Sequence, residues 1–252
     1  MTIYYNEIDP YAAQWLENLM WAGHIAPGVV DTRSIEDVHP ADLKDFTQCH
    51  FFAGIGVWSL ALRRAGWPDD RPVWTGSCPC QPYSKAGKGL GFADERHLWP
   101  AWHWLIRECK PVQIVGEQVS DAIKHGWLDL VGTDLEAEDY AVGAMLFRSS
   151  DVGAPVERQR AYFAANRLGQ RVARQLAGSH SGQVGPWGWR GQEDLRAIAA
   201  APLQPGDRWP QPILRRVDHG LAECMGGLHA VGNAINAEAA RVFIEAVMEC
   251  QP

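Results

Sequence analysis

Cys80 stands between two prolines in the stretch Pro79-Cys80-Gln81-Pro82, which Tyr83-Ser84 follow. Proline fixes its own φ, lacks an N–H group and restricts the residue before it, so this thiol lies on a stiff loop rather than in a helix. A thiol held in this way suits covalent catalysis, which splits one difficult step into two easier ones. A proline-rich surface loop that happens to contain a cysteine would give the same pattern, so the rest of the chain must decide between the two.

Two acidic side chains follow strand-like runs. Glu117 comes after the apolar run 112–116, and an acid at the carboxyl end of an interior strand is in the usual place for an active-site group. Burial there would favour its protonated form, which could donate a proton to a base. Glu7 could bind a ribose diol, while Asp9 before Pro10 fits a helix cap.

A glycine turn and an arginine pair complete the candidate chemistry. Phe52-Ala53-Gly54-Ile55-Gly56 lies between an apolar run and a helix, where glycines let a ligand approach the backbone, although a tight turn explains the pattern as well. Arg158 and Arg160 are two residues apart at the start of a strand, so they share a face. A plain surface pair is the alternative.

Charge is unevenly distributed along the chain. The net charge is −7, but the segment 158–216 contains ten arginines, no lysines and three acids (10 − 3 = +7), so the remainder carries −14. Arginine favours phosphate and guanine because its planar fork makes paired hydrogen bonds. We therefore expect this segment to contact DNA or RNA, with ordinary solvated charge as the alternative.

Composition restricts the class of protein. The 252 residues, 46% of them hydrophobic, can bury a large core. The six cysteines do not form a disulfide framework, and Cys78 and Cys80 are too close for a CxxC site, so we expect free thiols and no metal. The sequence has no run of a membrane-span length and no signal-peptide pattern, so we expect a cytoplasmic protein.

Hydrophobic periodicity predicts an α/β fold. Strands are expected at 3–5, 29–30, 50–53, 73–75, 112–116, 140–147 and 160–164, and helices at 11–22, 57–65, 97–108, 127–138 and 236–247. Strands that alternate with helices imply a mostly parallel sheet covered on both faces. Residues 1–164 and 213–252 should form the main domain. Residues 165–212 do not continue the alternation of strands and helices and are expected to form a small insert.

Together these motifs resemble the DNA cytosine-5 methyltransferase family. The residues that match its glycine, nucleophile, Glu-Asn-Val, Gln-x-Arg-x-Arg and closing motifs are 52–56, 79–84, 117–119, 156–160 and 232–235. Departures are Tyr83 for phenylalanine, Gln118 for asparagine and the loss of the leading glutamine before Arg158. The resemblance implies a Rossmann-like S-adenosylmethionine-dependent methyltransferase fold, with 165–212 as a small target recognition region.

The order of the motifs differs from the family. The acid at Glu7 and the adenine-contacting segment 30–35 both precede the glycine motif, as if the first strand–helix unit had been moved. The glycine strand and the nucleophile strand are sheet neighbours in the family, so this order is topologically permitted, and it resembles a phage and prophage branch. Asp31 and Ser34 are both candidates for the adenine contact.

The resemblance implies methyl transfer to C5 of a flipped cytosine in double-stranded DNA, with S-adenosylhomocysteine as the second product. Cys80 would be the nucleophile, Glu117 the proton donor at N3, and Arg160 with Arg158 the group that holds O2. The implied cofactor contacts are Phe52, Ala53, Gly54, Ile55, Gly56, Glu7, Ile8, Asp31, Ser34, Ile35, Pro79, Asn233 and Ala234, and the implied DNA contacts are Gln81, Ser84, Arg167, Arg171, Arg190 and Arg215.

Three alternatives remain at the level of sequence: a tRNA cytosine-5 methyltransferase, a non-catalytic DNA-binding relative, and the use of a modified cofactor or the transfer of another group on the same scaffold. The chain is expected to act as a monomer, in a bacterial or phage-infected cell, where restriction-modification or self-protection would need such an enzyme. The recognition region is short, which predicts a short target site or loose specificity.

Overall fold

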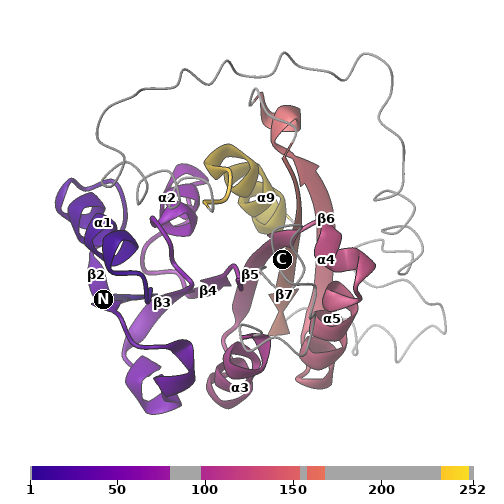
Figure 1. Cartoon of the computed structure of the whole chain (residues 1–252), viewed down its shortest axis with the longest axis horizontal. Helices are drawn as coiled ribbons and strands as arrows, with labels where there is room; N and C mark the ends of the chain where they lie inside the picture. The colour runs from indigo at the N-terminus through magenta and orange to yellow at the C-terminus, as the bar shows by residue number, and fades with distance from the viewer. Residues whose placement is uncertain (1, 80–97, 154–157, 168–233, 250–252) are drawn as a thin grey trace, which may run out of the picture.

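The computed structural model describes residues 2–79, 98–153, 158–167 and 234–249, which form a seven-stranded sheet with helices on both faces (Figure 1). The strands are β1 (Thr2–Asn6), β2 (Gly28–Asp31), β3 (Phe46–Phe51), β4 (Val73–Gly76), β5 (Gln113–Val119), β6 (Ala141–Arg148) and β7 (Gln159–Asn166). The helices are α1 (Pro10–Trp21), α2 (Val57–Arg64), α3 (Trp99–Cys109), α4 (Asp121–Lys124), α5 (Trp127–Ala137) and α9 (Ala237–Glu249). Short 3-10 turns are η1 (Ile35–Asp37), η2 (Pro40–Leu43) and η4 (Ser149–Val152).

The strand order explains the unusual order of the motifs. Across the sheet it is β2-β1-β3-β4-β5-β7-β6, with β1 to β5 parallel and β7 antiparallel to both of its neighbours. If β3 is counted first, β1 second and β2 third, the five parallel strands follow the order 3-2-1-4-5 of dinucleotide-binding sheets. The chain from β2 to β3 passes over β1, and β3 pairs directly with β4, as the sequence predicts. The fold is therefore Rossmann-like, with its first strand–helix unit displaced.

This rearrangement gives one crossover the opposite hand. Helices α1 and α2 lie on the same face of the sheet, where a Cβ on Gly56 would come 2.9 Å from Leu16, and α3 lies on the other face (Figure 1). The β1–α1–β2 and β3–α2–β4 units run in opposite directions across the sheet on one face, so their hands are opposite. The β4–α3–β5 unit changes both direction and face, so it has the hand of β1–α1–β2. Because nearly all such crossovers are right-handed, β3–α2–β4 is the exception.

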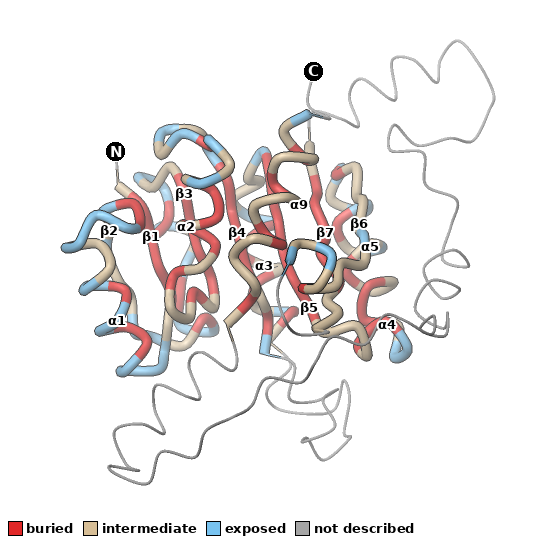
Figure 2. Tube along the Cα trace, turned by 90° about the horizontal axis from the view of Figure 1, so that it is seen from above, coloured by how far each residue is buried: buried red, intermediate tan, exposed pale blue. Residues whose placement is uncertain are grey.

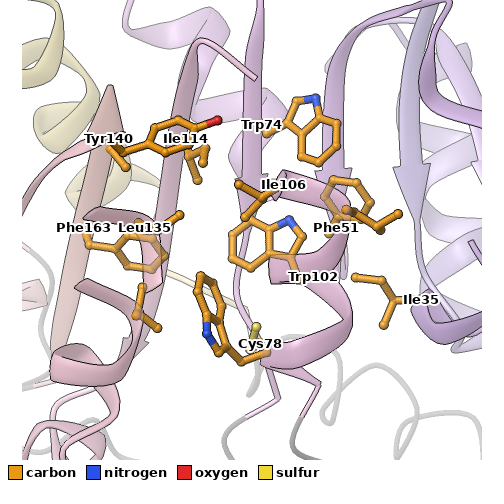
Figure 3. Packing of buried hydrophobic residues seen from close by; sticks show 14 of the residues in the cluster. Ile35, Phe51, Trp74, Cys78, Trp102, Ile106, Ile114, Leu135, Tyr140 and Phe163 are labelled. Atoms are coloured by element: carbon orange, nitrogen blue, oxygen red, sulfur yellow. The ribbon is translucent and has the colours of Figure 1, made fainter. Parts of the chain in front are cut away.

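Side chains fill both faces of the sheet. Strand residues form a buried layer between the helices (Figure 2). On the α3 and α5 face, Trp102 packs among Phe51, Phe163 and Ile106 (Figure 3). Gly76 makes room for this ring, since a Cβ there would lie 2.5 Å from it. On the other face, α2 and α9 cover a second cluster that contains Trp58 and Tyr162.

The expected elements are present, with differences at their ends. The structure extends β5 to Val119, so Glu117 lies inside the strand rather than after it, because residues 117–119 pair with β7. β3 starts at Phe46 and ends at Phe51, before the glycine turn. β7 continues to Asn166, so residues 165 and 166 belong to the sheet and not to the insert. The rest of that insert, from 168 onward, lies outside the described residues. The sequence analysis missed α4 and the three 3-10 turns.

The described ranges contain neither a membrane-spanning helix nor a cluster of metal-binding side chains. Within residues 2–79, 98–153, 158–167 and 234–249, no helix has the length and hydropathy of a membrane span. No three His, Cys, Asp or Glu side chains in the same ranges are grouped as metal ligands.

Candidate active site

The carboxyl ends of the four neighbouring strands β1, β3, β4 and β5 meet at one edge of the sheet. Glu7 follows β1, the glycine turn 52–56 follows β3, Ser77 follows β4, and Glu117 lies near the end of β5. Ligands of open α/β sheets bind at this edge, where the strand order reverses. The sheet thus brings together residues that are up to 110 positions apart in the sequence (117 − 7 = 110).

The glycine turn has a left-handed backbone at three positions. The φ angles are +52° at Phe52, +54° at Gly54 and +78° at Gly56. Phe52 is one of three described non-glycine residues with positive φ, and such residues gather at functional sites. A Cβ on Gly56 would also come 3.1 Å from Ile25, whereas a Cβ on Gly54 would meet nothing within 4 Å. The turn is therefore packed against the side chains of Leu16 and Ile25 at Gly56, whereas nothing crowds it at Gly54.

Glu7 joins the first strand to this turn. One of its carboxylate oxygens accepts a hydrogen bond from the Gly54 N–H at 2.6 Å, and the other accepts one from the Asp9 N–H at 2.9 Å. Burial raises the pKa of Glu7, against the opposing effect of these backbone bonds. The Asp9 side chain caps α1 by accepting from the Ala12 N–H, and Pro10 is the first helical residue. The cap is thus confirmed at Asp9, and the Glu7 carboxylate, held by backbone N–H groups of the loop and the glycine turn, keeps acceptor capacity for a further donor.

Asp31 and Ser34 differ in how far they are engaged. The Asp31 carboxylate accepts from the Tyr4 hydroxyl at 2.8 Å and pairs with the Arg33 guanidinium at 2.7 Å. Arg33 also pairs with Asp42 at 2.9 Å. Ser34 caps η1 through a longer bond of 3.4 Å from the Glu36 N–H. The Asp31 carboxylate is thus engaged by two partners within 2.8 Å, whereas Ser34 makes only longer bonds of 3.4 Å, to the N–H and to the carboxylate of Glu36.

Glu117 forms a buried ion pair with Arg160. Its Oε1 lies 2.7 Å from the Arg160 Nε, and its side chain is 8% exposed. Burial raises the pKa of Glu117, while the charges of Arg160 and Arg158 and a hydrogen bond from Ser77 act in the opposite direction. Arg158 also donates to the Ala234 carbonyl at 2.5 Å, which connects this group to the segment before α9. Glu117 therefore lies beside both arginines, with an ion pair to Arg160 alone.

The segment that leads to Cys80 is held by β5. The Gln118 side-chain amide donates to the Cys78 carbonyl at 3.3 Å and accepts from the Val119 N–H at 2.9 Å. Cys78 itself points into the aromatic core, where burial raises the pKa of its thiol, and Pro79 is exposed. Of the two closely spaced thiols, Cys78 is therefore unsuited to chemistry.

The remaining expected contacts divide into three groups. Ile8 is 64% exposed beside Glu7, whereas Ile35, the first residue of η1, is buried. Arg167 lies at the opposite edge of the sheet, where its guanidinium donates to the Lys110 carbonyl and its N–H to the Val112 carbonyl. This position favours a structural role. The residues outside the described ranges are Cys80, Gln81, Ser84, Asn233, Arg171, Arg190 and Arg215.

The sequence analysis missed two residues near this site. Ser77 accepts a hydrogen bond from the Trp58 indole N–H at 3.1 Å and lies beside Glu117 on the neighbouring strand, where it lowers the pKa of Glu117. No motif marks either residue, because their contact depends on how α2 packs against the loop after β4.

Comparisons with known proteins point to one family. A family model described as C-5 cytosine-specific DNA methylase matches residues 66–183. The type II methyltransferase M1.ScrFI of Lactococcus lactis subsp. cremoris is 35% identical over 97 residues, which cover 37% of this chain and 25% of the relative. The type II methyltransferase M.HgiCII of Herpetosiphon aurantiacus is 28% identical over 161 residues, which cover 48% of this chain and 37% of the relative.

Solved structures show more distant likeness. A mutant of Spodoptera frugiperda DNMT2 is 19% identical, with a TM-score of 0.45, and the match covers 65% of this chain and 42% of that one. The Dnmt2 methyltransferase of S. pombe is 15% identical, with a TM-score of 0.40 over 64% of this chain and 40% of that one. The chain spans only a quarter to about a third of the length of the curated relatives above. The matched segment 66–183 includes the proline-flanked Cys80, the buried Glu117 and the arginine pair 158 and 160, and over this segment the chain is similar to C-5 cytosine-specific DNA methylases.

Proposed function

We propose that this chain transfers a methyl group from S-adenosylmethionine to C5 of cytosine in double-stranded DNA, through a covalent bond between Cys80 and a flipped base. The buried Glu117–Arg160 pair carries this proposal. It lies at the ligand-binding edge of the sheet, on the strand that also holds the segment before Cys80 through Gln118. A carboxyl with a raised pKa beside a guanidinium can donate to one ring atom of cytosine while the arginine donates to another.

Glu7 and the glycine turn fit an adenosine-containing cofactor. The Glu7 carboxylate has acceptor capacity left for a ribose hydroxyl, and a Cβ on Gly54 would meet nothing within 4 Å, so a ligand can approach the backbone there. The exposed Ile8 offers an apolar surface next to them. Ser34 is our choice for the adenine contact, because the Asp31 carboxylate is committed to Tyr4 and Arg33. When bound, the cofactor supplies an electrophilic methyl group for C5.

The residues of the chain would act in sequence on the base. The flipped cytosine costs a few kcal/mol of unpairing and unstacking, which contacts from the arginine-rich segment must offset. The Cys80 thiolate forms a bond to C6, which makes C5 nucleophilic, while Glu117 donates its proton at N3 and Arg160 holds O2. After C5 is methylated, its proton departs to a base such as water, the sulfur–C6 bond breaks and N3 returns its proton to Glu117, so that Cys80, Glu117 and the ring double bond are restored.

Cys80 is the thiol we assign to this role because its neighbour cannot fill it. Cys78 is buried and its pKa is raised, so it would rarely be a thiolate near neutral pH. Pro79, between the two, is exposed.

The test is methyl transfer by the purified protein. Duplex DNA and S-adenosylmethionine are incubated with the unmodified chain, with Cys80→Ala and with Cys109→Ala, and nucleosides are measured by mass spectrometry. We expect 5-methylcytosine with the unmodified chain and with Cys109→Ala, whose half-buried thiol lies outside the site, and none with Cys80→Ala. Product from Cys80→Ala would contradict the nucleophile, and product only when tRNA replaces DNA would contradict the substrate.

Cofactor binding is measured separately by titration calorimetry with S-adenosylmethionine. Glu7→Gln should weaken binding about tenfold, because hydrogen bonds to a charged acceptor are worth about 1.5 kcal/mol or more. Asp42→Asn, on the outer side of the Arg33 pair, serves as the control and should bind normally. Equal binding by Glu7→Gln and the unmodified chain would contradict the assignment of Glu7.

A further inference from the structure

Ser77 is placed between two elements of the candidate site. It directly follows Gly76, which pairs with Gly116 in the β4–β5 ladder, so Ser77 and Glu117 are neighbours at the same edge of the sheet. Residues alternate between faces along a strand, and Ser77 therefore faces α2 and α9, as Glu117 does, while Cys78 faces the aromatic core.

The hydrogen-bond partners of Ser77 determine the direction of its hydroxyl. An indole N–H is only a donor, so the Ser77 oxygen accepts the 3.1 Å bond from Trp58. A serine hydroxyl has one proton, and that proton is then available to the Glu117 carboxylate, which lies beside Ser77 on the same face of the neighbouring strand. In agreement with this placement, the Ser77 hydroxyl lowers the pKa of Glu117 against the effect of burial. The indole thus orients a hydroxyl donor toward the acid.

Glu117 is surrounded by few groups that could substitute for this hydroxyl. The charged and titratable side chains that face it in the described part of the chain are Arg158, Arg160 and Tyr162, all from β7 or the residue before it. The Tyr162 hydroxyl is buried and has no hydrogen-bond partner there. Ser77 is therefore the neutral donor to Glu117 among the described residues.

We propose that Ser77, oriented by the Trp58 indole, is a positioning residue that holds the Glu117 carboxyl in the geometry for proton donation to the target base. This inference rests on the proposed function, since it assigns a supporting residue to the same site. It also links the glycine turn to the acid, because Trp58 lies in the first turn of α2, directly after Gly56.

Removal of the Ser77 hydroxyl should have two separate effects, one on the rate of methyl transfer and one on the pKa of Glu117. Without the hydroxyl, the Glu117 carboxyl is less well fixed, so methyl transfer is slower. The carboxylate also loses a bond that stabilises its charged form, so Glu117 stays protonated to higher pH. A residue with only a structural role would lower the rate or the yield of folded protein and leave the pH dependence unchanged.

The experiment is the pH profile of the single-turnover methylation rate at saturating DNA and S-adenosylmethionine. Ser77→Ala should lower the maximal methylation rate about tenfold. It should also move the pH at which the rate falls on the alkaline side to a higher value. Ser77→Thr, which keeps the hydroxyl, should restore both values. Trp58→Phe should lower the maximal methylation rate a few-fold, because the hydroxyl remains but is no longer oriented. Tyr162→Phe, the matched control, removes a hydroxyl without a partner on the same face and should match the unmodified chain.

An unchanged profile in Ser77→Ala, or a Ser77→Thr variant that behaves like Ser77→Ala, would overturn the proposal. A second measurement does not depend on catalysis or on DNA: carbon-13 NMR of the Glu117 carboxyl in the full chain, assigned with Glu117→Gln. Its titration midpoint should rise in Ser77→Ala and not in Tyr162→Phe. If the midpoint rises while the unmodified chain methylates no DNA, the proposed function fails and the positioning role of Ser77 stands. If the midpoint does not move, the positioning role fails, whatever the activity.

Discussion

Glu117 and His50 are both buried ionisable side chains, and burial favours the neutral form of each. It raises the pKa of Glu117 and lowers the pKa of His50 to about 3. For Glu117 the neutral form is the proton donor that our proposed mechanism needs. For His50, which bonds to Thr75 at 2.7 Å and stacks on Tyr5, the neutral form is a condition of folding. The same physical effect thus serves chemistry at one residue and constrains stability at the other.

His50 makes the stability of the fold depend on pH. Its pKa is about 3 in the folded chain and about 6.5 when unfolded, so the unfolded chain binds the proton first as the pH falls. The stability is fully present above pH 6.5 and decreases below it. Between pH 7.5 and pH 5 we expect His50 to account for a loss of about 2 kcal/mol in the free energy of unfolding.

Urea denaturation of His50→Asn at the two pH values tests this expectation. Asparagine can keep the bond to Thr75 but does not titrate, so the difference between the two pH values should shrink by about 2 kcal/mol. His24→Asn, at an exposed position, is the control and should keep the full difference. An undiminished difference in His50→Asn would mean that other groups cause the pH dependence.

At the scale of elements, the loop from α2 to β4 closes the crossover of exceptional hand. Residues 65–72 are held by several side chains. The buried Gln48 donates to the Pro68 carbonyl at 3.0 Å and to the Arg71 carbonyl at 3.2 Å. The Trp67 indole donates to the same Arg71 carbonyl at 3.0 Å, and Arg63 pairs with Asp69 at 2.7 Å. Because the usual preference for a right-handed connection does not favour this loop, specific contacts must hold it.

Gln48→Ala should therefore destabilise the fold by about 2 kcal/mol. The change removes two buried hydrogen bonds, at about 1 kcal/mol for each bond, although the Pro68 carbonyl keeps the Arg71 N–H and the Arg71 carbonyl keeps the Trp67 indole as donors. The measurement is the free energy of unfolding in urea. Gln14→Ala, which also removes two side-chain hydrogen bonds but on the exposed face of α1, should change it by less than about 0.5 kcal/mol. Equal effects of the two substitutions would contradict the importance of the loop contacts.

The sequence predicts the elements well and their contacts poorly. The periodicity and glycine signals predict the seven strands and the five longer helices, and the displaced motifs predict that β3 pairs with β4. The end of β5 was wrong because Glu117 and Gln118 are polar, and only their pairing with β7 makes them part of a strand. The Trp58–Ser77 bond could not be predicted, since it depends on the rotation and position of α2 over the sheet. The choice between Asp31 and Ser34 likewise required the Tyr4 and Arg33 contacts.

At the scale of the whole molecule, positive charge is concentrated in the arginine-rich segment 158–216, and the rest of the chain is acidic. The chain has a net charge of −7, but residues 158–216 carry +7. The two arginines of this segment that pack near Glu117 lie in or beside β7, and most of the others fall between 168 and 216, outside the described residues. An acidic body with one basic segment would restrict the binding of DNA to that segment, because the like charge of the remainder repels phosphates.

The length of that segment limits how much sequence it can read. The predicted recognition region, 165–212, has 48 residues, of which the first two already belong to β7. Each paired arginine–guanine contact is worth about 1–3 kcal/mol of discrimination, and a short surface offers few of them, so we expect a target of about two to four base pairs. Bisulfite or nanopore mapping of DNA methylated to completion by the purified chain would measure the target. A strict site of about six base pairs would require more direct contacts than 46 residues can readily supply, and would point instead to reading through DNA deformation. Arg190→Ala and Arg215→Ala would then separate the two routes, since loss of a base contact relaxes the site at one position, whereas loss of a phosphate contact weakens binding uniformly.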